Sequence, residues 1–141
     1  MQMVTPIVLQ DFDVGWLATD AVGHVALFTT GGRGPIPDTA LPSVENAEEF
    51  VLSLPEVSDV ELVTSMSGTN AFVAFAKRGF FAYDWSDVHR DTCQALRGYE
   101  LQYRPTSPLT LADLSAPLRA LAEVTRLPDV TFGASIIAIA E

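Results

Sequence analysis

The stretch that most constrains the fold of this chain runs from Phe72 to Trp85, FVAFAKRGFFAYDW. It is rich in Phe, Tyr, Trp and Val, the residue types that fill the pleated surface of a strand. The run is interrupted at Lys77-Arg78-Gly79, and a short loop that ends in Gly supplies the left-handed residue of a type I turn plus bulge. The stretch therefore predicts a central β-hairpin. Strand alternation places two sets of side chains on opposite faces of its second half: Phe81, Tyr83 and Trp85, and Phe80, Ala82 and Asp84. Because both sets are mainly apolar, we expect a hairpin that is covered on both sides.

The other predicted strands also come mostly as hairpins. Residues 16–20 and 24–29 flank the turn Ala21-Val22-Gly23, where Asp20 can accept hydrogen bonds from backbone N–H groups. Residues 56–71 include a short strand formed by Val57, Val60, Leu62 and Val63. Residues 99–104 alternate as a half-buried strand, with Tyr99, Leu101 and Tyr103 on one face. Two last short strands, residues 130–132 and 136–140, are expected on either side of Gly133.

Two helices complete the predicted fold. The first follows Ser43, its expected N-cap, and buries Val44, Ala47, Phe50, Val51 and Leu54 before Pro55 ends it. The second begins at about Ala116, with Pro117 in its first turn, after a capping pair formed by Thr110 and Asp113. We therefore expect residues 1–141 to form a single α+β domain, with a mainly antiparallel sheet built from hairpins and about two helices packed on it.

Composition limits the class of protein. The single cysteine, Cys93, excludes an internal disulfide and fits a reducing compartment. The N-terminus lacks the basic and apolar regions of a signal peptide. No segment approaches the roughly 18 apolar residues that cross a bilayer. We therefore expect a cytoplasmic protein with no membrane association.

The charge is unevenly distributed. The chain has a net charge of -10, and residues 1–70 hold ten acids and one base, Arg33. Residues 71–141 hold eight acids and seven bases. A strongly acidic chain repels nucleic acid and anionic membranes, whereas an acidic half can attract a basic partner. Acidity can equally serve solubility alone.

Two clusters in the first half of the chain suggest chemistry. The run Gly31-Gly32-Arg33-Gly34 has the glycines of a phosphate loop, but Pro35-Ile36-Pro37 stands where a P-loop requires Lys, Ser or Thr and then a helix. A structural or partner-contacting loop is favoured. Asp20 and His24 face each other across a tight turn, and such a pair can act as a general base. No nucleophile stands beside them, so a capped hairpin is favoured over a hydrolase site.

A third cluster lies at Asp87, His89, Asp91 and Cys93, which include residue types that bind metals. Two histidines and one cysteine in the whole chain are a poor ligand inventory, so we expect no metal and no cofactor. Cys93 lies four residues after His89, the spacing of a helical thiolate–base pair, but a lone cysteine is more often a small buried hydrophobe. Asp84 is expected to be structural, with a partner such as Arg104 or a backbone donor.

Several segments together carry a resemblance to a known group of proteins. They are residues 16–20 (WLATD), 23–30 (GHVALFTT), 34–37 (GPIP) and 79–85 (GFFAYDW), followed by Tyr103-Arg104-Pro105 and Pro108-Leu109. In this order they resemble small bacterial cytoplasmic proteins of the immunity type, which accompany polymorphic or contact-dependent toxins. The resemblance spans about residues 12–132 and implies a non-enzymatic protein that blocks a cognate toxin. It brings no catalytic residues with it.

The favoured hypothesis is an immunity-type protein that binds a basic toxin through an acidic surface. Its first candidate contacts are Asp38, Glu45, Glu48 and Glu49, because the helix that buries Phe50, Val51 and Leu54 should turn its glutamates to water. The alternatives are an interaction or regulatory module without a toxin partner, and a small hydrolase that uses Asp20, His24 or Cys93.

Overall fold

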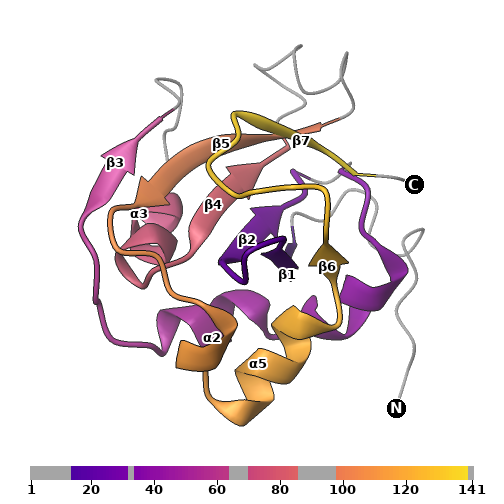
Figure 1. The fold of residues 1–141 in the computed structure, drawn as a ribbon, viewed down its shortest axis with the longest axis horizontal. Helices are drawn as coiled ribbons and strands as arrows, with labels where there is room; N and C mark the ends of the chain where they lie inside the picture. Colours follow the sequence, from indigo (N-terminus) through magenta and orange to yellow (C-terminus); the bar gives the residue numbers. More distant parts are fainter. Residues whose placement is uncertain (1–13, 32–33, 64–69, 86–97, 140–141) are drawn as a thin grey trace.

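One mixed β-sheet organises the structure (Figure 1). The computed structural model describes residues 14–31, 34–63, 70–85 and 98–139, and all element bounds below refer to these. The strands are β1 (Gly15–Asp20), β2 (Val25–Thr29), β3 (Val60–Leu62), β4 (Phe81–Asp84), β5 (Gly98–Pro105), β6 (Arg126–Leu127) and β7 (Ile136–Ala138). The helices are η1 (Asp38–Ser43), α2 (Ala47–Leu52), α3 (Asn70–Lys77), η2 (Leu111–Asp113) and α5 (Ala116–Glu123), with η marking 3-10 helices.

The described strands form a seven-stranded sheet in the order β3-β5-β4-β2-β1-β6, with β7 also paired to β5. The predicted α+β class is confirmed, but the expectation of a sheet built from antiparallel hairpins is only partly right. Two strand pairs are parallel: β2 with β4, and β1 with β6. Parallel neighbours need a long crossover, and residues 30–80 supply one between β2 and β4.

The first hairpin forms as the sequence predicts. β1 and β2 are antiparallel, with Trp16 opposite Phe28 and Thr19 opposite Val25. Gly23 closes the turn at a φ of 90°, a left-handed conformation that glycine adopts without strain. The Asp20 carboxylate accepts hydrogen bonds from the backbone N–H groups of Val22 and His24, at 3.0 and 2.9 Å.

The central hairpin predicted for residues 72–85 is wrong in its first half, which forms the helix α3. Phe72, Phe75 and Ala76 are buried at helical spacing. Gly79, with a φ of 88°, ends this helix instead of closing a hairpin. Its N–H binds the carbonyl of Ala76 at 3.0 Å, and the N–H of Phe80 binds that of Phe75 at 3.2 Å. This pair of bonds is a Schellman motif, which also places glycine at a left-handed position.

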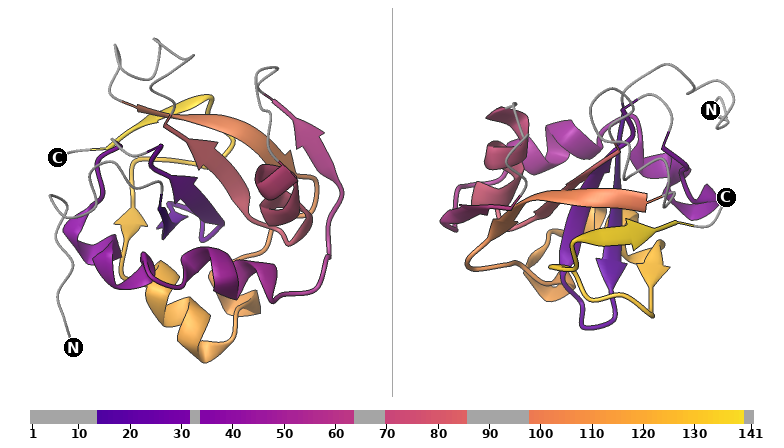
Figure 2. Two further views of the ribbon diagram at one scale, coloured as in Figure 1. Left: turned by 180° about the vertical axis from the view of Figure 1, so that it is seen from behind. Right: turned by 90° about the horizontal axis from the view of Figure 1, so that it is seen from above.

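The second half of that stretch behaves as predicted, because β4 is covered on both sides. Phe81, Tyr83 and Trp85 join a core with Trp16, Phe28 and Tyr99 on one face of the sheet. Phe80 and Ala82 join a second core, to which α2, α3 and α5 all contribute buried side chains. Figure 2 shows these helices from two further directions. Three α-helices thus pack on this face of the described sheet, where the sequence predicted about two in all.

The alternation predicted for residues 99–104 breaks within β5. Tyr99 and Leu101 belong to the first core, but Tyr103 packs against the second. The cause is a register shift: Tyr83 lies opposite Leu101 while the preceding Ala82 lies opposite Tyr103. Gln102 is therefore an extra residue in β5, and such a bulge turns the following side chain to the other face.

The C-terminal segment mixes confirmed and wrong predictions. α5 begins at Ala116 with Pro117 in its first turn, and the Asp113 carboxylate accepts the Thr110 N–H at 2.9 Å. β7 confirms part of the last predicted strand. Residues 130–132 are not a strand, since Phe132 makes only an isolated bridge to Ala134. The short strand β6, which the sequence analysis missed, instead pairs with β1.

Gly23 and Gly79, two of the four glycines with positive φ among the described residues, offer a matched test of the helix end at Gly79. A Cβ at Gly79 would lie 2.5 Å from Cγ of Leu109, whereas a Cβ at Gly23 would meet nothing within 4 Å. Gly23→Ala should cost about 1–2 kcal/mol of unfolding free energy, from backbone strain alone. Gly79→Ala should cost about 1–3 kcal/mol more, because Leu109 must also move. Urea denaturation of both variants measures the difference, and equal costs would show that the helix end is not tightly packed.

Candidate functional site

The carboxylates chosen from the sequence lie on one continuous outer segment. Asp38 begins η1, Glu45 lies in the turn that follows, and Glu48 and Glu49 lie in the first turn of α2. From there the chain passes around the outside of the sheet to β3 (Figures 1 and 2). We call residues 38–63 the acidic belt. The belt contains no Lys or Arg, and its acidic residues are Asp38, Glu45, Glu48, Glu49, Glu56, Asp59 and Glu61.

Ser43 anchors the belt to the sheet and does not cap a helix. Its buried Oγ accepts the N–H of Leu17 in β1 at 3.2 Å and donates to the carbonyl of Ala40 at 2.7 Å. The expected N-cap is therefore wrong, and α2 begins only after Asn46. Pro42 fits inside the 3-10 turn, and the Ser43 hydroxyl satisfies a backbone group of the sheet instead of a helix start.

The glutamates of the belt differ in exposure. Glu45 and Glu49 are exposed, as is Asp38. Glu48 is only half-buried and packs against β1, since a Cβ placed on Gly15 would lie 3.0 Å from its Cγ. The prediction that all of these glutamates face water is therefore wrong for Glu48. Three of the four chosen carboxylates remain in a position to meet a partner.

The belt carries few compensating charges. Glu61 lies 3.5 Å from Nε of Arg104, and both side chains are exposed, so this pair contributes little to stability. Within the described residues, Asp38, Glu45 and Glu49 make no salt bridge. The exposed carboxylates of Asp38, Glu45 and Glu49 therefore give this part of the belt a negative surface that can attract cationic groups.

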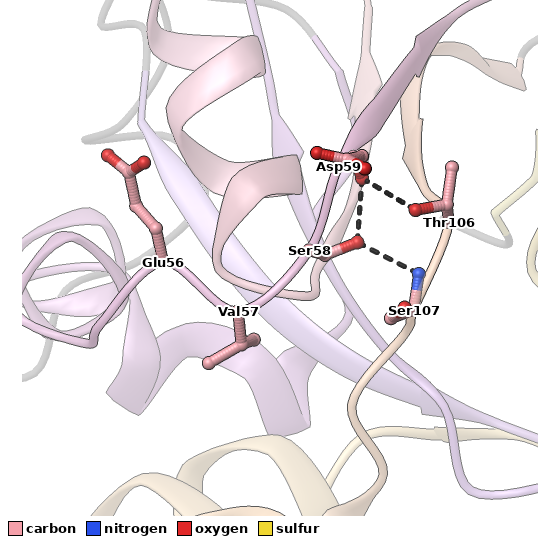
Figure 3. Close-up of a pocket in the computed structure, with 6 residues that line it drawn as sticks. All are labelled: Glu56, Val57, Ser58, Asp59, Thr106 and Ser107. Atoms are coloured by element: carbon pink, nitrogen blue, oxygen red, sulfur yellow. Dashed lines mark hydrogen bonds between the residues drawn. The ribbon is translucent and has the colours of Figure 1, made fainter.

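A shallow polar groove lies where the belt passes the end of β5. The sequence analysis did not find it. It is lined by Glu56, Val57, Ser58, Asp59, Thr106 and Ser107 (Figure 3). The Ser107 N–H donates to Oγ of Ser58 at 2.8 Å, and the Thr106 N–H donates to the carbonyl of Asp59 at 2.9 Å. These bonds hold the two walls together, while the Glu56 carboxylate points away from them (Figure 3).

The Asp20–His24 pair is built as a structural unit. Asp20 is fully buried, and besides the two turn amides it accepts the N–H of Phe132 at 2.7 Å. Nδ1 of His24 lies 3.8 Å from Oδ2 of Asp20, beyond hydrogen-bond distance, and has no hydrogen-bond partner. A catalytic base needs a hydrogen bond to a nucleophile and another to the group that orients it. In the described geometry the Asp20 carboxylate binds backbone amides and does not orient His24, and Nδ1 of His24 bonds to no nucleophile.

Tyr83 is a buried titratable group that interacts electrostatically with Asp20. Burial raises the pKa of its phenol well above the ordinary value, and the nearby Asp20 carboxylate raises it further, although the Gly133 N–H opposes this shift. Its hydroxyl donates to the carbonyl of Ala134 at 2.7 Å and accepts the Gly133 N–H at 3.0 Å. Tyr83 thus joins β4 to the turn before β7.

The remaining sequence candidates are partly described. Gly34 donates its N–H to the carbonyl of Thr30 at 2.8 Å, and its lack of a side chain lets the Tyr99 hydroxyl approach, so this end of the glycine run is structural. Asp84 accepts a hydrogen bond from the Thr29 hydroxyl. Asp87, His89, Asp91 and Cys93 lie outside the described residues, as do Gly32 and Arg33. Among the described residues, no group of three or more potential ligands could hold a metal ion, and no helix is long and apolar enough to cross a membrane.

Removing the Asp20 carboxylate should destabilise the fold. Asp20→Ala leaves the buried N–H group of Phe132 and the partly buried N–H groups of Val22 and His24 without their acceptor, and should cost about 3 kcal/mol or more of unfolding free energy. Asp20→Asn keeps one acceptor oxygen and should cost less. Urea denaturation compares the variants, and a loss below about 1 kcal/mol in Asp20→Ala would mean that the carboxylate is not the hub of this turn.

The raised pKa of Tyr83 predicts a loss of stability at high pH. Its phenol ionises more readily in the unfolded chain, where the pKa is about 10, than in the folded protein. The contribution of the protonated Tyr83 phenol to the stability of the fold is therefore complete below pH 10 and is lost progressively as the pH rises above this value. Tyr83→Phe should flatten this decline while losing about 1 kcal/mol at neutral pH from the missing hydrogen bonds. Denaturation curves from pH 8 to 11.5 test this, and an unchanged decline in the variant would assign it to other groups.

Comparison with known proteins finds no relative that indicates a function for this chain. The chain matches no protein-family model, no curated protein and no solved structure. What the described residues offer is an acidic belt fixed to a two-sided core, with three exposed carboxylates among those chosen from the sequence.

Proposed function

We propose that this chain is a non-enzymatic binding protein that neutralises a basic protein toxin, in the manner of an immunity protein. The observation that carries the proposal is the acidic belt. Asp38, Glu45 and Glu49 are exposed on a segment without Lys or Arg, and they make no salt bridge among the described residues. A neutral or evenly charged surface would offer a basic partner no such advantage.

The physical basis is electrostatic complementarity. A surface of one sign speeds the encounter with a partner of the opposite sign and disfavours partners of the same sign. The belt is also held rigidly, because Ser43 binds β1 while Ala47 and Val51 of α2 are buried. A rigid surface loses little conformational entropy when a partner binds. These features support tight and selective capture of a basic protein.

A module that binds a basic partner other than a toxin would use the same surface, and only the identity of the partner separates it from an immunity protein. The first experiment is therefore a binding assay against the product of a neighbouring gene in the genome of origin. It should be accompanied by an assay of whether this chain suppresses the toxicity of that product. Binding without suppression would favour the module.

Charge reversal tests the acidic belt directly. Glu45→Lys together with Glu49→Lys should slow association with the basic partner by about tenfold or more at low salt. The loss should shrink as ionic strength rises and the Debye length falls. Stopped-flow or surface-based kinetics at low and high salt measure both effects.

A matched control keeps the change in net charge the same. Glu123→Lys together with Asp129→Lys reverses two exposed carboxylates outside the belt. This control should retain most of the association rate. Equal slowing in both double variants would mean that only net charge matters, and unchanged association in the belt variant would remove Glu45 and Glu49 from the interface.

A further inference from the structure

The strand β3 lies at one end of the sheet order, so only one of its two edges is paired within the described residues. Figure 1 shows β3 at the outer rim, beside β5, and no described strand lies beyond it. An open edge presents backbone N–H and C=O groups that can pair with another chain. This edge belongs to the acidic belt.

The hydrogen bonds to β5 reveal which groups point outward. The Val63 N–H donates to the carbonyl of Gln102, and the Thr106 N–H donates to that of Asp59, both at 2.9 Å. Residues 59 and 63 therefore face β5, and so does residue 61 between them, because backbone groups alternate along an antiparallel strand. Val60 and Leu62 turn their N–H and C=O groups to the open side. Pro105 lies opposite Val60, a position that requires no N–H from it.

The side chains along this edge also remain uncovered. Six large hydrophobic side chains are exposed in the described structure, and four of them lie in the acidic belt: Leu52, Val57, Leu62 and Val63. Single exposed apolar residues are ordinary, but a concentration along one segment is typical of an interaction surface. Leu62, at 53% exposure, stands directly on the open strand.

Charge decides which occupant fits. Glu56, Asp59 and Glu61 are exposed along the same edge, and residues 52–63 contain no Lys or Arg. A second copy of this chain would place like charges opposite one another, which is destabilising. An extended segment that alternates apolar with basic residues would instead set its apolar side chains beside Leu62 and its cations beside Asp59 and Glu61, where they would share Glu61 with Arg104.

We propose that β3 is the docking edge for an extended basic segment of the partner, which joins the sheet as an additional strand. This mode of recognition takes affinity from main-chain hydrogen bonds and specificity from alternate side chains. The inference rests on the proposed function, because it assumes a basic partner and specifies how that partner is held.

Nuclear magnetic resonance on the isotope-labelled full chain tests the edge with a defined probe. The probe is a capped Lys-Val-Lys-Val-Lys-Val peptide, with two controls: the same peptide N-methylated at alternate residues, in both registers, and a Glu-Val repeat. The lysine peptide should shift the amide signals of Val60 and Leu62 and slow their hydrogen exchange. One N-methylated register should lose most of this effect, and the glutamate peptide should show none.

Two outcomes would overturn the proposal that β3 is a docking edge. One is a lysine peptide that binds but leaves Val60 and Leu62 unshifted while perturbing amides near Glu45 and Glu49. In that case the acidic surface stands and strand addition fails. The other is a lysine peptide that does not bind at all, which rejects strand addition, while the proposed function is still decided separately by the charge-reversal kinetics with the whole partner.

A pair of variants at Leu62 separates the backbone from the side chain. Leu62→Pro removes the outward N–H without removing a bond to β5, whereas Leu62→Ala shortens the side chain and keeps the N–H. Peptide affinity should be about fivefold or more weaker in Leu62→Pro than in Leu62→Ala, the value of one backbone hydrogen bond. Circular dichroism confirms that both variants are folded. Equal affinities in two folded variants would contradict strand addition, and the N-methylated peptides test the same bond on the unmodified chain.

Discussion

The stack of aromatic rings across three strands is the interaction on which the rest of the structure depends. Trp16 of β1 lies 4.2 Å from Phe28 of β2, centroid to centroid, and Phe28 lies 5.0 Å from Tyr83 of β4, with the rings nearly parallel in both pairs. Tyr99 of β5 meets the first two rings edge-on. A one-residue slip of any strand would move its ring to the opposite face. The stack therefore fixes the register of β1, β2 and β4, including the parallel pair β2–β4.

The same rings position the belt. The Tyr99 hydroxyl accepts the indole N–H of Trp16 and donates to the carbonyl of Pro35, so the entry to η1 is tied to the core. At the other end of α2, Nε of Arg78 donates to the carbonyls of Leu52 and Leu54, at 3.2 and 2.9 Å. A segment bound to the core before η1 and after α2 can carry many like charges on its outer side, because their mutual repulsion is small compared with the burial that holds the segment in place.

Features with a local cause could be predicted from the sequence, and features set by a distant partner could not. The turn at Gly23 and the start of α5 at Ala116 follow from neighbouring residues, and both were predicted. Residues 72–77 are apolar at both helical and strand spacing, and a left-handed Gly79 suits either a hairpin or a helix end, so local pattern could not decide between them. In the site, helical periodicity predicted the exposure of Glu49, and Glu45 is also exposed although it lies in the turn before α2. The packing of Glu48 on Gly15 and the pairing of residues 58–59 with 106–107 depend on tertiary contacts that no local pattern encodes.

The outer edge of β1 is paired by β6, a strand near the C-terminal end of the chain, and this order has a consequence for folding during synthesis. Thr19 and Asp20 pair with Arg126 and Leu127, and the Asp20 carboxylate accepts a hydrogen bond from the amide of Phe132, which lies 112 positions further along the chain. A ribosome makes the first hairpin well before these partners exist. During that interval the nascent hairpin has an open edge on β1 and a carboxylate oxygen that water must solvate. Folding of this kind is governed by long-range contacts and is comparatively slow. The growing chain is thus most exposed to pairing with other nascent chains before β6 emerges.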